Sequence, residues 1–251
     1  MRFDPPLIET RFQRRYKRFF ADVDALDGVA EEGPLTVHCP NSGSMLGCVA
    51  PGIRAWISDS GNPARKLRYT LELLEVRAPD VHGTPGHPTR VCVNTQRPNH
   101  LVEEALCRGR LPSLAGFDRL DREVAYGAEG SRIDLRLHFG ERLAYVEVKN
   151  ATMGVGGGRT LFPDAVTTRG AKHLRELQAM VAQGHRGVLV FCAGRDDTQI
   201  VAPADHIDPA YGRALREAAA AGVEIYALRA RIDNTDIELV DEVPVELSHA
   251  P

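Results

Sequence analysis

The spacing of apolar and polar positions changes near residue 80, and this change predicts two parts of the chain. Before it, short β-rich segments alternate with clusters of turn residues. The predicted strands include LTVHCP, RAWISDS and RYTLELLEVR, and the turn clusters include CPNSGSM and SGNPA. Several short strands separated by such turns are typical of a small barrel or sandwich. Residues 79–90, rich in Pro, Gly and His, have the composition of a connector.

Helical and strand patterns alternate in the second part. Three segments have helical character: PNHLVEEALCRGRL, TTRGAKHLRELQAMVAQG and DPAYGRALREAAAAG. We expect Asn99 to cap the first helix and Thr167 or Thr168 to cap the second, which ends at Gly184. GVLVFCA is an apolar run typical of a strand covered on both faces, and VEIYALRA is another strand. Helices alternating with buried strands predict an α/β fold around a central mixed sheet.

Two further strands carry ionisable side chains. SRIDLRLHF and LAYVEVKN are joined by a short GER turn, which predicts a β-hairpin. Because neighbouring side chains of a strand point to opposite faces, Glu147 and Lys149 share one face. If the hairpin pairs as its spacing suggests, Asp134 lies beside them. The same pattern also fits an exposed strand with a solvated charged face.

Two carboxylates at one point predict a cation site. Asp134 and Glu147 would repel each other, and a divalent cation relieves the repulsion. Mg²⁺ or Mn²⁺ suits a small set of oxygen ligands, to which the backbone carbonyl of Val148 would contribute. Asp134 followed by Glu147 and Lys149 resembles the PD-(D/E)xK nuclease pattern, in which a helix precedes the strands, and this resemblance implies a further carboxylate from Glu104 (or Glu103). Lys149 would then place a positive charge at a scissile phosphate or orient the attacking water. The sequence thus allows phosphodiester hydrolysis at this hairpin.

Composition limits the other possibilities. The 251 residues are 43% hydrophobic and 26% charged, with a formal net charge of -3, so a nucleic-acid surface would have to be a local patch. The five cysteines are scattered and form no C-x-x-C pair, which favours reduced thiols. The N-terminus lacks an apolar signal region, and no apolar run is long enough to span a membrane. We therefore expect a cytoplasmic protein that does not contact membranes.

A local patch of this kind stands near the start of the chain. RRYKR mixes cations with an aromatic ring, which suits neutralisation of phosphates and stacking on bases, at Arg14, Arg15, Tyr16, Lys17 and Arg18. The alternative is a strand with Tyr16 and Phe20 in the core and the arginines in solvent. In PNSGSM, Asn41 and Ser44 offer polar groups for a phosphate, or the segment is a plain turn.

Longer motifs resemble a known family. QRRYKRFFADV, VHCPNSGSMLGC, CVNTQRPNHL, YGAEGSRIDLRL, YVEVKNATM, FPDAVTTRGAKHLREL and GVEIYALRA together are similar to the sugar fermentation stimulation protein A family. The resemblance implies an N-terminal OB-like β-barrel, at residues 1–82, followed by a PD-(D/E)xK nuclease-like α/β domain, at residues 83–251. Asp134, Glu147 and Lys149 match the nuclease motif, in which Ile133 replaces the proline.

The resemblance also implies partners and further site residues. The family is described as DNA-binding, with a role in regulating maltose metabolism. The helix after the hairpin would direct side chains to the site, namely Thr168, Arg169, Lys172 and His173. We therefore predict a DNA-binding protein with a Mg²⁺-dependent nuclease site, and a homodimer would suit cleavage of both strands. The alternative is a non-catalytic DNA-binding transcriptional regulator of sugar metabolism with a vestigial nuclease fold.

Overall fold

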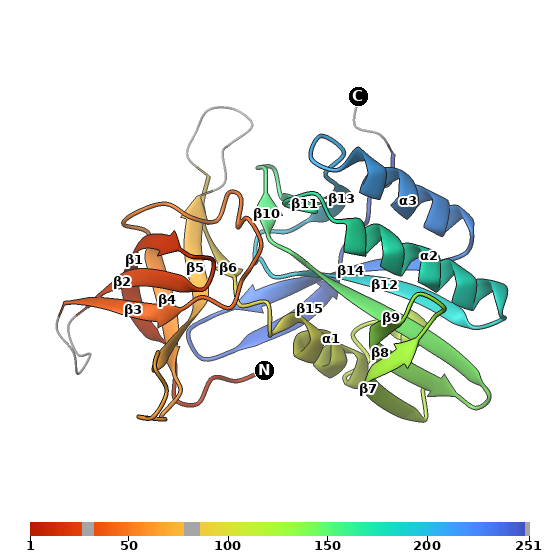
Figure 1. Cartoon of the computed structure of the whole chain (residues 1–251), viewed down its shortest axis with the longest axis horizontal. Helices are drawn as coiled ribbons and strands as arrows, with labels where there is room; N and C mark the ends of the chain where they lie inside the picture. Colours follow the sequence, from red (N-terminus) through yellow and green to blue (C-terminus); the bar gives the residue numbers. More distant parts are fainter. Residues whose placement is uncertain (27–32, 78–85, 249–251) are drawn as a thin grey trace.

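The computed structural model describes residues 1–26, 33–77 and 86–248 of the chain. They form two domains that lie side by side, one built on strands alone and one on a sheet with helices on both faces (Figure 1). Both predicted fold classes are confirmed. Among the helices that the structure describes, none is long and apolar enough to cross a membrane.

The first domain is a curved six-stranded sheet. Its strand order is β3-β2-β1-β4-β5-β6, and a parallel bridge between His38 of β3 and Thr70 of β5 brings the sheet round on itself. The alternating apolar residues of these strands fill one interior, as expected of a barrel. The strands are β1 (Ile8–Tyr16), β2 (Phe20–Ala25), β3 (Pro34–His38), β4 (Arg54–Asp59), β5 (Tyr69–Arg77) and β6 (Pro88–Cys92).

The predicted boundary between residues 82 and 83 lies outside the described residues, as does most of the predicted connector. Strand β6 follows it and pairs antiparallel with β5, so the first sheet extends to Cys92. The N-terminal residues, in turn, contact the second domain, since the backbone N–H of Phe3 donates to the carbonyl of Thr235. The side chains of Phe3 and Leu7 are buried in a core shared by both domains.

The second domain is built around a mixed sheet of order β15-β14-β12-β9-β8-β7. Strands β9, β12 and β14 are parallel, and the outer pairings are antiparallel. A small second sheet has the order β10-β11-β13. The strands are β7 (Arg119–Tyr126), β8 (Ser131–Phe139), β9 (Arg142–Ala151), β10 (Met153–Gly154), β11 (Arg159–Phe162), β12 (Arg186–Ala193), β13 (Ile200–Pro203), β14 (Glu224–Ile232) and β15 (Ile237–Glu242).

Three α-helices cover this sheet. Helix α1 packs on one face and α2 and α3 on the other, as Figure 1 shows. The helices are α1 (Pro98–Cys107), α2 (Thr168–Ala182), α3 (Pro209–Ala220) and a 3₁₀ turn, η1 (Pro112–Leu114). Each α-helix confirms a predicted segment.

The helix caps differ in their outcome. Thr167 caps α2 as predicted, since its Oγ1 accepts a hydrogen bond of 3.1 Å from the N–H of Gly170. The predicted cap of α1 is wrong: Arg97 occupies that position, and Asn99 lies inside the first turn. Pro98 explains the shift, because proline is favoured at the first helical position, where its missing N–H is not needed. The side chain of Asn99 is therefore free to contact another element.

Candidate functional site

The predicted hairpin of β8 and β9 forms, and its ladder ends where the ionisable residues begin. The register pairs Leu135 with Val146, and no further pair follows toward Asp134 and Glu147 among the described residues. In place of a ladder bond, the N–H of Val148 donates to Asp134 Oδ2 at 2.7 Å. The strands therefore separate at this point, and a carboxylate occupies the opening.

Asp134 is held between β9 and α1. Its second oxygen, Oδ1, accepts a 2.8 Å hydrogen bond from the amide of Asn99. Burial and, to a smaller extent, the charge of Glu147 raise the pKa of Asp134 to about 6, against the opposing effects of the two hydrogen bonds and the charge of Lys149. Asp134 and Glu147 are the next positions after the last ladder pair, so the two carboxylates belong to neighbouring positions of adjacent strands.

Glu147 is almost fully buried, with 3% of its surface exposed. Its Oε1 accepts a 2.6 Å hydrogen bond from Lys149 Nζ and contacts His173 Nδ1. Burial raises the pKa of Glu147, but the hydrogen bond to His173 and the charge of Lys149 outweigh burial, and the pKa falls below its ordinary value. Its Oε2 has no hydrogen-bond partner within the described part of the chain.

His173 is a member of this cluster. It lies on the buried face of α2, and its Nε2 accepts a 3.2 Å hydrogen bond from Arg169 Nε. Because Arg169 is only a donor, Nδ1 of a neutral His173 carries the proton and donates it to Glu147. The side chain of His173 is therefore buried and hydrogen-bonded through both ring nitrogens. Arg169 and His173 fix the orientation of Glu147 from the α2 side.

Other predicted site residues lie elsewhere. Thr168 is exposed at the start of α2, and Lys172 donates to the backbone carbonyl of Glu129 at 2.5 Å. Glu104 pairs with the N-terminal ammonium and with Arg108, away from Asp134. Residues four apart share a face of a helix, so Glu104 lies on the face of Arg108 and not on the face toward Asp134.

The helix face toward Asp134 instead carries Asn99 and Glu103. Both line a cavity of about 360 Å³ together with Asp134. The carboxylate of Glu103 is paired with Arg122 at 2.6 Å. Glu103 was the alternative to Glu104 in the sequence, and it is the one on the side of the site.

Side chains alone do not supply enough ligands for a divalent cation at this site. In residues 1–26, 33–77 and 86–248, no three His, Cys, Asp or Glu side chains gather closely enough to hold a metal by themselves. In an extended strand the N–H and C=O of one residue point to the same side, so the carbonyl of Val148 points toward Asp134 as its N–H does. Two carboxylates and one carbonyl suit Mg²⁺, which keeps several waters and also takes phosphate oxygens.

Two buried groups beside this cluster were not predicted. Glu176 follows His173 by three residues on α2, is almost fully buried, and has an Oε2 without a partner among the described residues. The hydroxyl of Tyr126 is likewise buried and unpartnered in the described chain, and burial with the charges of Glu147, Glu176 and Asp134 raises its pKa. Glu176 could have been found from the sequence, because it is a glutamate on the otherwise apolar face of the predicted helix.

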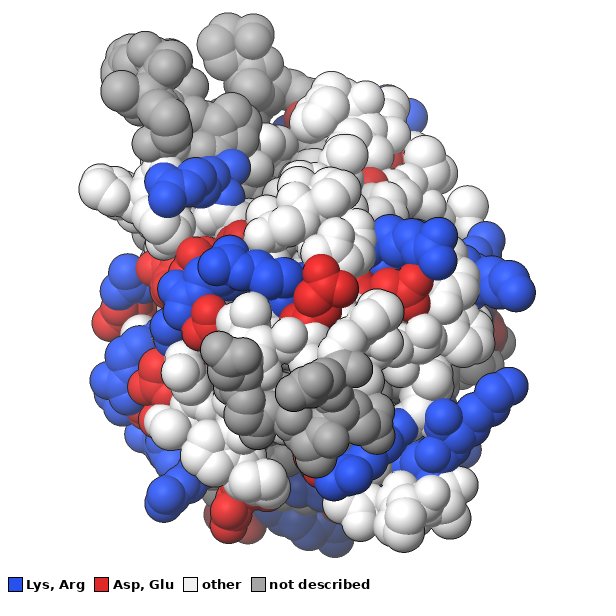
Figure 2. Space-filling view, turned by 90° about the vertical axis from the view of Figure 1, so that its left-hand side faces the viewer, with Lys and Arg blue, Asp and Glu red and all other residues white. Residues whose placement is uncertain are grey.

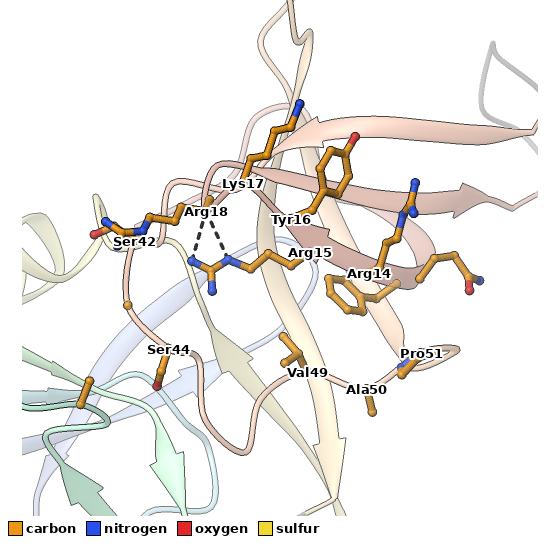
Figure 3. A pocket seen from close by; sticks show the side chains of 14 residues that line it. Arg14, Arg15, Tyr16, Lys17, Arg18, Ser42, Ser44, Val49, Ala50 and Pro51 are labelled. Atoms are coloured by element: carbon orange, nitrogen blue, oxygen red, sulfur yellow. Dashed lines mark hydrogen bonds between the residues drawn. The ribbon is translucent and has the colours of Figure 1, made fainter. Parts of the chain in front are cut away.

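The basic segment of the first domain lines a cavity of about 680 Å³. Figure 3 shows Arg14, Tyr16 and Lys17 on one side of it and Val49 and Pro51 on the other. Tyr16 stacks on Phe20 with ring centroids 5.6 Å apart, and both rings are partly exposed. The interpretation of these aromatics as core residues is therefore wrong.

The cations of this segment differ in their contacts. Arg14 pairs with Asp22 at 2.7 Å, and Arg15 donates to the carbonyls of Arg18 and Asn41. Lys17 and Arg18 stand at the hairpin tip with φ of 48° and 64°. Their side chains are exposed and have no hydrogen bond or ion pair to any described residue.

Asn41 and Ser44 connect the two domains. Asn41 is buried and donates to the carbonyl of Val93 at 3.0 Å, just before α1. Ser44 Oγ donates to Asp164, 2.8 Å from both its backbone carbonyl and its carboxylate, just before α2. The loop between them thus contacts the approaches to both helices that hold the carboxylates of the hairpin.

Comparisons with known proteins agree with this architecture. Residues 96–236 match the family described as "Sugar fermentation stimulation protein RE domain", and residues 14–81 match "SfsA N-terminal OB domain". Sugar fermentation stimulation protein homologs from Teredinibacter turnerae and Pseudomonas aeruginosa are 53% and 50% identical to this chain, each over 98% of it and 100% of their own length. The chain therefore belongs to the sugar fermentation stimulation protein family, with an OB domain followed by a restriction endonuclease-like domain.

One solved structure is similar over almost the whole chain. It is Pyrococcus furiosus SfsA in complex with Ca²⁺, which is 26% identical, has a TM-score of 0.81 and is covered over 96% of each chain. The agreement extends over both domains.

Proposed function

We propose that this protein is a DNA nuclease that depends on Mg²⁺ or Mn²⁺, with Asp134, Glu147 and Lys149 as its catalytic residues. One observation carries the proposal: two carboxylates stand at neighbouring positions of adjacent strands where the ladder ends, and Glu147 Oε2 is buried without a partner among the described residues. Leaving such an oxygen unpaired is costly. A cation would relieve this cost and the repulsion from Glu147, which together with burial raises the pKa of Asp134.

The ligands of the cation would be Asp134, Glu147 and the carbonyl of Val148. When bound, a divalent cation supplies electrostatic stabilisation of the charge that develops on a phosphate. The Ca²⁺ complex of the related Pyrococcus furiosus protein supports a hard cation, because Ca²⁺ and Mg²⁺ both take oxygen ligands.

The protein's own side chains would divide the remaining tasks. Lys149 carries a positive charge beside the carboxylates, where a scissile phosphate would lie. His173 donates from Nδ1 to Glu147 and so orients the carboxylate, while Arg169 fixes the tautomer of His173. Arg169 is exposed at the start of α2, where a second phosphate of the strand would be within reach.

The test is a cleavage assay with plasmid and single-stranded DNA, in the presence of Mg²⁺ or Mn²⁺ and of EDTA. We expect metal-dependent cleavage that Asp134→Ala and Lys149→Ala each reduce by at least about 100-fold while DNA binding is retained. Lys66→Ala, which removes an exposed cation of the first domain, is the matched control and should cleave normally. Activity that survives both site substitutions would come from a contaminant, and the proposal would be abandoned.

A second candidate function is a DNA-binding transcriptional regulator of sugar metabolism without catalysis. The observation that favours it is that Glu147 Oε1 is already occupied by Lys149 and His173, so this oxygen is not free to bind a cation. The same assay separates the two, since a regulator would bind DNA without cleaving it in any of these metals.

DNA is the partner that both candidates require, and the cytoplasm is the location where we place the protein. Five free cysteines, four of them buried, are consistent with a reducing compartment.

A further inference from the structure

The large cavity of the first domain has an unusual combination of lining groups. Four cations contribute to it, Arg14, Arg15, Lys17 and Arg18, and no carboxylate is among the residues that line it. Elsewhere on this domain, the outer face in Figure 2 has Lys and Arg side chains interspersed with Asp and Glu. The absence of carboxylates therefore distinguishes the cavity from its surroundings and favours an anionic occupant.

The same cavity has an apolar wall. Val49, Ala50 and Pro51 form one side of it, and Val49 is 41% exposed (Figure 3). Leu46 in the same loop and Val166, which follows the lining residue Ala165, are also exposed. Phosphates alone do not require apolar surface, so the wall indicates that the occupant has both charged and flat apolar parts.

Tyr16 gives the cavity a pre-ordered aromatic ring. One contact is the stacking on Phe20, and another is a hydrogen bond of 3.1 Å from its hydroxyl to Asp22. The guanidinium of Arg14 lies 5.0 Å from the ring centroid. A base that contacts the exposed part of this ring, or displaces Arg14 from it, meets a ring that is already fixed, so little entropy of the Tyr16 side chain is lost on binding.

The hairpin tip keeps its two outermost cations available. Lys17 and Arg18 adopt a left-handed backbone that is unfavourable for residues other than Gly, Asn and Asp. Arg15 stabilises this tip through the carbonyl of Arg18 and ties it to the loop at Asn41. Asn and Gly usually occupy such a hairpin tip, but here Lys17 and Arg18 do, and their position allows them to contact phosphates.

The cavity also adjoins the candidate catalytic site. Ala165 of the second domain lines it, and Thr167, two residues later, caps the helix that carries His173. Ser44 of the first domain binds Asp164 at the same place. A strand that leaves the cavity along this segment is directed toward the start of α2.

We propose that the cavity binds single-stranded DNA, with bases against Tyr16 and Val49 and phosphates at Lys17 and Arg18, and that the substrate of the nuclease site is therefore single-stranded. In a duplex the bases are paired and stacked inside, and bringing one out costs a few kcal/mol. The statement about substrate rests on the nuclease function proposed above, whereas the statement about binding does not.

Binding without cleavage tests it directly. Fluorescence anisotropy in EDTA compares labelled oligo-dT of about 15 nucleotides, a length that an OB fold can cover, with a mixed-sequence duplex of the same length. We expect the single strand to bind at least about tenfold more tightly than the duplex. Tyr16→Ala should weaken the single strand by about tenfold or more, as for loss of one stacked base.

Matched variants protect the result from misfolding. Tyr16→Phe keeps the ring and should keep the affinity, and Val49→Asp should reduce it by placing a carboxylate in the cavity. Leu26→Asp, at an exposed apolar residue outside the cavity lining, should bind as the unmodified protein does. The double variant Lys17→Ala and Arg18→Ala should flatten the dependence of affinity on salt, since fewer phosphates are neutralised.

The failure of each proposal is distinguishable. Equal or tighter binding of the duplex, or unchanged binding by Tyr16→Ala and Val49→Asp, overturns the inference even if Asp134-dependent cleavage is found. Absence of binding to either oligonucleotide also overturns it and points to another anionic partner, such as an acidic protein. Selective single-strand binding without cleavage in any metal supports the cavity and overturns only the nuclease.

Discussion

Two buried glutamates, one in each domain, show the difference between a structural and a poised carboxylate. Glu72 of the first domain is fully buried, and both of its oxygens are paired, with Ser58, Asn94 and both ends of the Arg97 guanidinium. Glu147 of the second domain is nearly as buried, but only one oxygen is paired. Complete pairing holds elements together, whereas incomplete pairing leaves a donor for a ligand.

The largest expected effect would come from breaking the complete network. Arg97→Met leaves the carboxylate of Glu72 buried without a counter-charge, and the free energy of unfolding should fall by about 3–5 kcal/mol. Urea denaturation measures it. Adding Glu72→Gln to this variant should restore part of the loss, and a loss below about 1 kcal/mol would mean that the pair behaves like an exposed one.

The next largest effect is expected from removing the charge of Lys149 beside the incompletely paired Glu147. Lys149→Met should lower the rate of DNA cleavage by about 100- to 1,000-fold, as when one preorganised donor to a developing charge is removed. Single-turnover rates in Mg²⁺ measure this, with circular dichroism to check the fold. The same rates for Arg97→Met, corrected for its folded fraction, should stay near those of the unmodified protein. Similar losses in both variants would remove the distinction between the two glutamates.

A smaller effect is expected on stability as a function of pH. The pKa of Asp134 is raised to about 6 in the folded chain from 3.8, so the folded state holds a proton that the unfolded state releases between these values. The contribution of Asp134 to stability is therefore greatest below pH of about 4, and about 2–3 kcal/mol of this contribution is lost as the pH rises through 6.

Asp134→Asn carries no titrating group and should remove this loss. Urea unfolding from pH 4 to 8 in EDTA should show the variant gaining on the unmodified protein as the pH rises. Parallel profiles for the two proteins would show that Asp134 has an ordinary pKa.

The smallest effect concerns the contact between the domains. Ser44→Ala removes hydrogen bonds to Asp164, which still accepts one from the N–H of Met45, and should cost about 1 kcal/mol of stability. Ser42→Ala in the same loop is the control, because Ser42 makes no hydrogen bond to another described residue. Equal unfolding midpoints for the two variants would show that Ser44 contributes nothing to the junction.

Much of the fold could be predicted because its signals are local. The period of apolar residues located the hairpin of β8 and β9 and all three α-helices. The length of the hairpin turn also predicted that Asp134 lies beside Glu147, since side chains in a strand alternate and the turn sets the register. The cap of α1 failed, because Asn99 satisfies the usual preference for a cap but Pro98 fixes the start of the helix one residue earlier.

The sequence by itself determined the two fold classes and the residue types at the candidate site. Only the tertiary structure decided which atoms meet: His173 with Glu147, 26 positions apart, and Ser44 with Asp164, 120 positions apart. It also separated Arg14 and Arg15, which are paired within the first domain, from Lys17 and Arg18, which remain exposed. Periodicity reflects the backbone of a single element, but pairing and burial depend on how separate elements pack, and no local pattern encodes that packing.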